Sequence, residues 1–317
     1  MQFSRPLLFV CSICACLFWS CSSTPGEKAK TGGAASEPSP ASSPSSAPPA
    51  SVRSDPPPTP PARTEPWKAF TPKLTQSDLV ARFVEASRLL LGVPYVNGPL
   101  GEGEVGGPDP EPRYDLTRAD CVTFLEESLA LALAAPHSDD SYVPILDAIR
   151  YHDGKVGFAS RNHYMVLDWI PSNSWLLEDV TDDVVSGGHT RKIEKQIDRA
   201  AFLRDHGVEP RSGIDKLEKI KIEMIPIDDV RAAEKNLRSG DLIMWVAKKD
   251  GIDIAHTGMV VRAKDGALIH RHGSSKAGIS LDEPFFDYAT RVAPVFEGIM
   301  VLRLKPKAEP PGLAANE

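Results

Sequence analysis

The spacing of apolar residues changes along this chain, and that change constrains its fold more than any other feature. Between residues 75 and 151, apolar side chains recur every three or four positions, which is typical of helices with one buried face. From residue 241 onwards, apolar side chains alternate with polar or small ones, which indicates strands. Helices followed by an antiparallel sheet predict an α+β fold.

The expected elements can be placed by residue number. Helices are predicted within 75–92, 117–135 and 141–151. Ser77 is the expected cap of the first helix, and Thr117 or Asp120 that of the second. Strands are predicted at 241–247, 254–263, 267–273 and 297–304. Between these two groups, 160–170 and 216–227 have strand character, while 191–207 and 226–237 are predicted to be helices.

The first 64 residues are expected to lie outside the folded domain. Residues 1–21 carry one early arginine and then an apolar run, which is the layout of an export signal. Cys21 follows Ser20 as in a lipoprotein signal, so we expect lipidation at Cys21, with Cys16 or simple cleavage as alternatives. Residues 22–64 are mostly Pro, Ser, Ala and Thr and predict a disordered tether. The folded domain is expected at 65–307, followed by a polar tail at 308–317.

The charge of the chain argues against one broad class of partner. Its formal net charge is −7, and it contains no long run of lysine or arginine. Nucleic-acid binding needs a basic surface that pairs with phosphates. We therefore expect no nucleic-acid partner.

Cys121 has no other cysteine after residue 21 to pair with, so an exported chain would carry it as a free thiol. It falls in the first turn of the helix expected at 117–135, where the helix dipole favours a thiolate. A nucleophilic thiol needs a base, and His256, His270 and His272 lie on two neighbouring predicted strands. Two other interpretations stay open: Cys121 as a small core residue, and a three-histidine zinc site beside which Cys121 is incidental.

Four blocks of sequence, in this order along the chain, resemble one bacterial family. They are RADCVTFLEESLALAL, IRYHDGKVGFASRNHYMVLDWIPSN, DVTDDVVSGG, and DGIDIAHTGMVV followed by HRHGSS. The family is that of the N-acetylmuramoyl-L-alanine amidase-like cysteine hydrolases, a branch of the papain-fold cell-wall peptidases of the NlpC type. The resemblance covers residues from about 78 to 304 and implies a papain-like α+β fold. In that fold the nucleophile stands at a helix N-terminus packed on the C-terminal sheet.

The resemblance also assigns roles to individual residues. It implies that Cys121 is the nucleophile, that His256 is the general base and that His272 orients this base, with His270 as the alternative for the third role. It implies substrate contacts for Tyr95, Ser160, Arg161, His163 and Tyr164. No metal and no cofactor are implied.

The implied reaction is hydrolysis of the amide that joins N-acetylmuramic acid to L-alanine. Two alternatives stay open: a papain-fold endopeptidase that cuts within the stem peptide, and a noncatalytic wall-binding module. The expected partners are peptidoglycan or muropeptide fragments and, through the lipid anchor, a membrane. The chain is then expected in the bacterial cell envelope, exported to the periplasm and held at the outer membrane.

Overall fold

The computed structural model describes residues 65–312 apart from positions 105, 138, 186, 187, 211, 212, 215 and 216. The export signal at 1–21 with Cys21, the tether at 22–64 and the end of the polar tail lie outside the described residues and stay predictions. Within the described part, no helix has both the length and the apolar character needed to cross a membrane.

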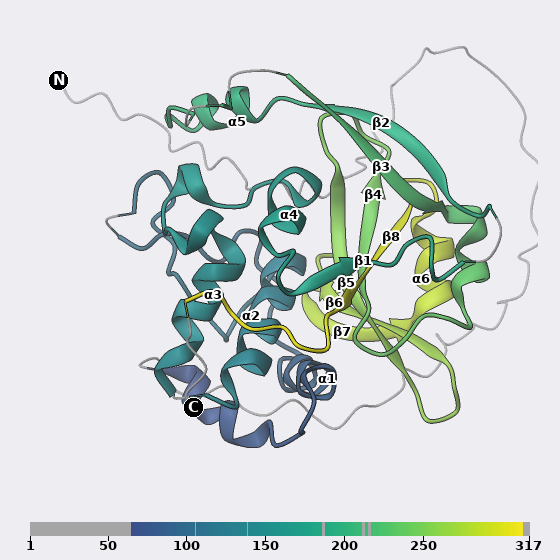
Figure 1. The fold of residues 1–317 in the computed structure, drawn as a ribbon, viewed down its shortest axis with the longest axis horizontal. Coiled ribbons are helices and arrows are strands. Elements are labelled where there is room, and N and C mark those ends of the chain that lie inside the picture. The colour runs from purple at the N-terminus through teal and green to yellow at the C-terminus, as the bar shows by residue number, and fades with distance from the viewer. Residues whose placement is uncertain are drawn as a thin grey trace, which may run out of the picture.

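Three helices of the N-terminal half form a layer on one side of the sheet (Figure 1). They are α1 (Leu79–Leu89), α2 (Cys121–Ala134) and α3 (Tyr142–Arg150), and they confirm the three helices expected there. Helix α2 contacts both α1 and α3 and is buried at every position except Val122. The Asp78 carboxylate accepts the Ala81 N–H at 2.8 Å, so the predicted cap at Ser77 is wrong by one residue.

Shorter helical turns connect these elements. They are η1 (Pro66–Ala69), η2 (Thr71–Lys73), η3 (Asp139–Ser141), η4 (His152–Gly154), η5 (Phe158–Ser160), η6 (Met165–Trp169), α4 (Ile170–Ser172) and η7 (Ile227–Ala233). The strand character expected at 160–170 is wrong, because η6 is a π-helical turn. Met165 and Trp169, four residues apart, both become buried in this turn, as neighbours on one helical face do.

The helix expected at 191–207 is also wrong over its first half. Residues Arg191–Ile197 form strand β2, and only Arg199–Asp205 form a helix, α5, which Asp198 caps. Lysine, glutamate and glutamine favour helices in isolation, but β2 pairs along its whole length with β3 (Glu218–Pro226). Cross-strand pairs such as Glu194 opposite Lys221 replace the helical contacts, so tertiary pairing overrides local propensity.

The described strands form one eight-stranded antiparallel sheet, in the order β2-β3-β8-β4-β5-β6-β7, with β1 (Leu177–Asp179) also paired to β8. The remaining strands are β4 (Leu242–Ala247), β5 (Ile254–Arg262), β6 (Leu268–Ser274), β7 (Ile279–Pro284) and β8 (Phe296–Leu304). Strands β4, β5, β6 and β8 are the four expected from the alternation. The α+β prediction with an antiparallel sheet is therefore confirmed.

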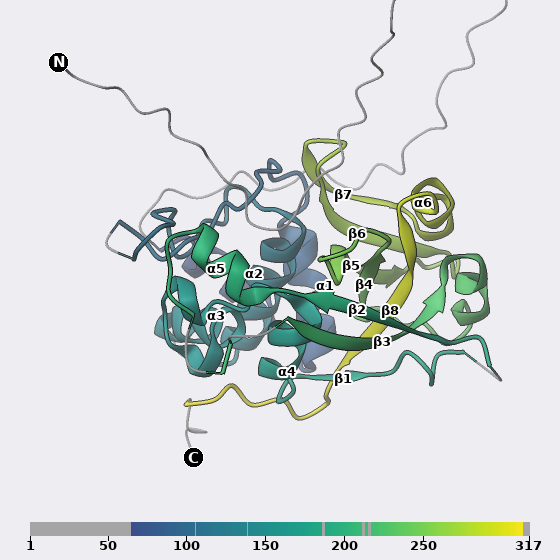
Figure 2. The same ribbon diagram turned by 90° about the horizontal axis from the view of Figure 1, so that it is seen from above.

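The sheet separates two hydrophobic cores. Figure 2 shows from above that α1–α3 lie on one side of the sheet and α6 (Phe285–Val292) on the other. Alternate residues of β4 enter the two cores: Leu242 and Met244 join the core under the helices, while Ile243 and Trp245 join the core under α6. Strand β4 is buried at every position for this reason. Helix α2 contacts the sheet at β5 and β6.

Candidate active site

The backbone of Cys121, the first residue of α2, is fixed by a capping box. The Asp120 carboxylate accepts the N–H groups of Val122 at 3.0 Å and Thr123 at 2.8 Å. The Thr123 hydroxyl in turn accepts the Asp120 N–H at 2.8 Å. These bonds satisfy amides that no helical carbonyl can reach. Asp120 is therefore the cap, and Thr117 is not.

Two strands hold this first turn of α2 in place. On β5, the Thr257 hydroxyl donates to the Cys121 carbonyl at 2.7 Å. On β6, a β-carbon at Gly273 would lie 2.8 Å from the Asp120 carbonyl oxygen, so a larger residue would push the turn away. The Cys121 side chain is fully buried at this junction.

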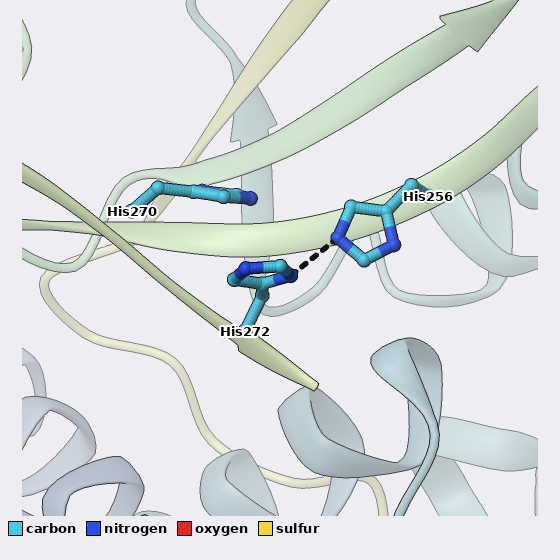
Figure 3. Close-up of side chains that lie close together, drawn as sticks. All are labelled: His256, His270 and His272. Atoms are coloured by element: carbon cyan, nitrogen blue, oxygen red, sulfur yellow. Dashed lines mark hydrogen bonds between the residues drawn. The ribbon is translucent and has the colours of Figure 1, made fainter. Parts of the chain in front are cut away.

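His256 on β5 contacts both Cys121 and His272. Its Nε2 atom lies 2.7 Å from Nδ1 of His272 (Figure 3), and its side chain is hydrogen-bonded to Cys121. Because Nε2 is engaged by His272, Nδ1 is the ring atom left for the thiol. Burial lowers the pKa of His256, and this effect outweighs the opposing influence of Cys121. Burial thus favours the neutral form of the His256 imidazole, and a neutral imidazole can accept a proton.

His272, and not His270, is hydrogen-bonded to His256. The other ring nitrogen of His272, Nε2, lies 2.8 Å from Oε1 of Glu283 on β7. His270 stacks on the His272 ring, with centroids 4.4 Å apart, and neither of its nitrogens has a hydrogen-bond partner in the described part of the chain. Burial lowers the pKa of His270 well below its ordinary value. A β-carbon at Gly258 would meet the His270 ring at 2.3 Å, so this glycine makes room for it.

The same three histidines were the candidate zinc ligands, and their geometry can be tested against that role. Each offers a nitrogen within 4.8 Å of the other two. A metal lies close to the plane of each imidazole that binds it, yet the His270 and His272 rings are stacked at only 24° to each other. Two stacked, nearly parallel rings do not direct their lone pairs at one common point. The arrangement fits a hydrogen-bond chain from Cys121 to Glu283 better than it fits a zinc site.

A pocket of about 70 Å³ opens beside Cys121 and His256. Two of the five residues expected to contact substrate, Arg161 and His163, line it. Arg161 is paired with Glu102 at 2.6 Å and Asp109 at 2.8 Å, and so anchors the glycine-rich loop that precedes α2. Burial and the neighbouring Arg161 charge lower the pKa of His163 to about 3, so its imidazole is neutral at physiological pH.

The other three expected substrate residues do not line this pocket. The Ser160 hydroxyl donates to the Gly157 carbonyl at 2.8 Å. Tyr164 is buried, which raises its pKa to about 12, and its ring packs against Phe202. Tyr95 pairs through its backbone with Ala119, close to the start of α2 but outside the pocket.

Three acidic residues at the site were not among the sequence candidates. Glu126, one turn along α2 from Cys121, lines the pocket and accepts the Trp169 indole N–H at 3.0 Å. Burial raises the pKa of Glu126 to about 7. Asp253 also lines the pocket and accepts the Val166 N–H at 2.7 Å. The third is Glu283. An acidic residue within an apolar helix was the sequence signal that could have found Glu126. Glu283 lies on β7, a strand that was not predicted.

Fold and site together define an α+β protein with a thiol–imidazole pair at the junction of a helix and an antiparallel sheet. Residues 85–296, more than half of the chain, match a family described as N-acetylmuramoyl-L-alanine amidase-like. The chain belongs to this family. Membership makes it a hydrolase that acts on an amide bond and whose substrate is peptidoglycan.

Solved structures of similar fold cover most of the folded part. Protein LPG0564 from Legionella pneumophila is 22% identical, with a TM-score of 0.67 over 76% of this chain and 93% of that one. An N-acetylmuramoyl-L-alanine amidase from Bacteroides uniformis is 25% identical, with a TM-score of 0.57 over 72% of this chain and 99% of that one. A protein from Bacteroides fragilis named as a xylanase is 26% identical, with a TM-score of 0.55 over 69% and 99%. Among curated proteins, no significant sequence match is found.

Proposed function

We propose that this protein is a cysteine-dependent N-acetylmuramoyl-L-alanine amidase. The observation that carries the proposal is the hydrogen-bond chain Cys121–His256–His272, which starts at the first residue of a buried helix. A thiol in contact with an imidazole that a third group orients is the arrangement of a nucleophile with its base. A helix N-terminus packed on a sheet that carries the histidines also supports a papain-like fold of the NlpC type.

The reaction begins when the Cys121 sulfur attacks the lactyl carbonyl carbon of muramic acid and His256 accepts the thiol proton at Nδ1. Asp120 already occupies the amides of Val122 and Thr123. The Cys121 amide is then the candidate donor to the negatively charged carbonyl oxygen.

The tetrahedral intermediate collapses when the bond between the carbonyl carbon and the alanine nitrogen breaks. His256 returns its proton to that nitrogen, and the stem peptide leaves with a free L-alanine amine. A water molecule, deprotonated by His256, then attacks the thioester, which releases the muramyl carboxylate and restores the Cys121 thiol. His272 keeps the His256 ring oriented through both steps.

Substrate contacts are proposed in the pocket beside Cys121. Arg161 and His163 line it, and Tyr95, Ser160 and Tyr164 are proposed only for the surroundings of the cleft, since they do not line the pocket. His163 is neutral and therefore acts as a hydrogen-bonding group and not as a charge.

Export and lipid anchoring are proposed from the sequence of residues 1–64. The apolar run before Cys21 and the proline-rich tether support a domain that is held at the outer membrane and reaches into the periplasm. Metabolic labelling with a radioactive fatty acid tests this: label in the wild type that is lost in Cys21→Ser supports the anchor, and label retained in that variant contradicts it.

Mass spectrometry of the products from defined muropeptides tests the reaction. The chain beginning at Ser22 is incubated with a muramyl tetrapeptide, and Cys121→Ala is the matched control. Release of the intact stem peptide with an L-alanine amino terminus is expected from the wild type only. Cleavage after D-glutamate would assign the endopeptidase activity instead, and binding without cleavage would assign the wall-binding module.

Two inhibitors separate the thiol mechanism from the zinc alternative. A thiol-alkylating reagent is expected to abolish activity and a metal chelator to leave it unchanged. The reverse pattern, or activity retained in Cys121→Ala, would refute the role of Cys121. Xylan serves as a control substrate because one structural relative is named as a xylanase.

A further inference from the structure

The hydrogen-bond chain does not end at His272. Nε2 of His272 lies 2.8 Å from Oε1 of Glu283 on β7, and Oε2 of Glu283 lies 2.6 Å from the Arg291 guanidinium on α6. His272 is 2% exposed at its side chain and Glu283 16%, so the contact between them is largely shielded from water. Four elements thus contribute one residue each to a continuous path from α2 to β7: Cys121, His256, His272 and Glu283.

An ionised carboxylate at the end of this path sets the position of every proton along it. Burial raises the pKa of Glu283, but hydrogen bonds from His272 and Arg291 lower it further, and the net pKa lies below the ordinary value. A carboxylate only accepts hydrogen bonds, so the His272 proton must be on Nε2. Nδ1 of His272 then has a lone pair, and the hydrogen bond between the two rings requires the proton on Nε2 of His256. This leaves Nδ1 of His256 unprotonated, on the side that is available to Cys121.

The same carboxylate also bears on the charge that His256 acquires. Burial disfavours the protonated form of His256 and holds its pKa down. When His256 takes the Cys121 proton it becomes an imidazolium, and a negative charge two hydrogen bonds away stabilises that form. In the described part of the chain, Glu283 is the carboxylate that is hydrogen-bonded to this buried histidine pair.

We infer that Glu283 is a positioning residue for the Cys121–His256 pair: through His272 it fixes the tautomer of both histidines and supports the imidazolium that forms when the thiol loses its proton. This inference rests on the proposed thiol mechanism for its catalytic consequence, but its prediction about protons holds in the free protein. Arg291 holds the second carboxylate oxygen of Glu283, and its guanidinium also lies over the Tyr288 ring, 5.0 Å from the ring centroid.

Glu283 has a competing, purely structural role, since its contact with Arg291 also ties β7 to α6. Substitution Glu283→Gln removes the charge and retains the shape of the side chain. Substitution Asp287→Asn removes one negative charge from an exposed position of α6 and is the matched control. Both variants are made in the chain that begins at Ser22, in which Cys121 is the one remaining cysteine.

The first measurement needs neither a substrate nor a variant. Nitrogen-15 NMR of the histidine rings reports which nitrogen carries the proton. In the wild type at neutral pH, protons are expected on Nε2 of His272 and Nε2 of His256. A proton found on Nδ1 of His272 would overturn the inference even if every variant failed to fold.

The second measurement is the ultraviolet absorbance of the thiolate as a function of pH. Other ionisable groups surround the Cys121–His256 pair on the neighbouring elements: Asp120, Glu126, Arg150, Arg161, His163, Asp253, His270, His272, Tyr288 and, over the Tyr288 ring, Arg291. These groups are the same in the wild type, Glu283→Gln and Asp287→Asn, so a difference in thiolate titration between the wild type and Glu283→Gln reports the effect of Glu283. Thiolate formation in Glu283→Gln is expected to shift to higher pH by about one unit. No shift is expected in Asp287→Asn, and an equal titration in all three proteins would overturn the inference.

Kinetics then separate positioning from substrate binding. For Glu283→Gln we expect kcat to fall by about 10- to 100-fold, KM to change little, and the acid limb of the pH profile to move with the thiolate titration. A variant that unfolds more readily yet keeps the wild-type pH profile would show that the role of Glu283 is structural. If the wild type does not cleave muropeptides, the proposed function fails, but the NMR and absorbance results still decide the inference.

Discussion

Substitution Gly273→Ala should pull Cys121, the proposed nucleophile, away from His256, its proposed base. The added β-carbon would lie 2.8 Å from the Asp120 carbonyl oxygen, 3.0 Å from its carbonyl carbon and 3.3 Å from the Cys121 nitrogen. These are backbone atoms of a capped first turn, so no side chain can rotate away. To reach ordinary van der Waals contact, α2 and β6 must separate by about 0.5 Å. Since Cys121 lies on α2 and His256 on β5, the strand next to β6, the distance between Cys121 and His256 should increase by a similar amount.

The expected magnitude follows from that displacement. A misplacement of about 1 Å costs on the order of 10²-fold in rate, so about half of it should lower kcat by about tenfold. Overpacking at such a site should also lower the free energy of unfolding by about 1–3 kcal/mol. Product release from a muramyl tetrapeptide measures the first effect, and urea unfolding measures the second.

Substitution Gly266→Ala is the matched control for these measurements. Gly266 has a positive φ of 89° and no neighbouring atom within 4 Å of an added β-carbon. Its replacement should therefore lower stability by about 1 kcal/mol through backbone strain and leave kcat unchanged. If Gly273→Ala folds and turns over at the wild-type rate, the contact between α2 and β6 does not position Cys121, and the argument from close approach is wrong.

Two further predictions concern His270 and His163. Substitution His270→Leu removes two nitrogens that have no hydrogen-bond partner in the described part of the chain, so urea unfolding should show equal or higher stability. Product release should show most of the activity, whereas loss equal to that of His272→Ala would restore His270 as the third residue. His163 has a folded pKa of about 3 against an ordinary value of 6.5, so the unfolded state binds a proton more readily over that window. Stability is then fully present above pH 6.5 and falls as the pH drops towards 3, by up to about 5 kcal/mol. Substitution His163→Phe should flatten this part of a stability-against-pH curve, and an unchanged slope would contradict the assigned cause.

The elements that could be predicted from the sequence are those whose local pattern and tertiary environment agree. Strand β4 alternates because its two faces enter two different cores, and α2 is apolar because almost all of it is buried. Strand β2 could not be predicted, because its run rich in lysine and glutamate is paired only with a strand that comes about 25 residues later. Strand β7 was missed because ISLDEP is short, carries two acidic residues and ends in proline.

The sequence indicated that Cys121 and the three histidines lie close together, but not how their side chains are connected. Spacing on one strand places His270 and His272 on the same face and gives no reason to prefer either. Contacts with His256 on β5 and Glu283 on β7 distinguish His272 from His270. Glu283 stands opposite His270 in the register of β6 and β7, yet its side chain reaches diagonally to His272. Such a diagonal contact depends on sheet twist and side-chain rotamers, neither of which the sequence displays.

The cap of α2 serves the fold at some cost to the thiolate. Asp120 satisfies two amides of the first turn and accepts the Gly98 N–H at 3.1 Å, and replacement of such a cap typically costs about 1 kcal/mol. The same carboxylate lies one residue before Cys121, where its negative charge opposes a thiolate and offsets part of the helix dipole. In the proposed mechanism, His256 approaches the thiolate from β5 and supplies positive charge when it is protonated. Burial resists that charge, so His272 and Glu283, which hold the His256 ring, then contribute to thiolate stabilisation together with the helix N-terminus.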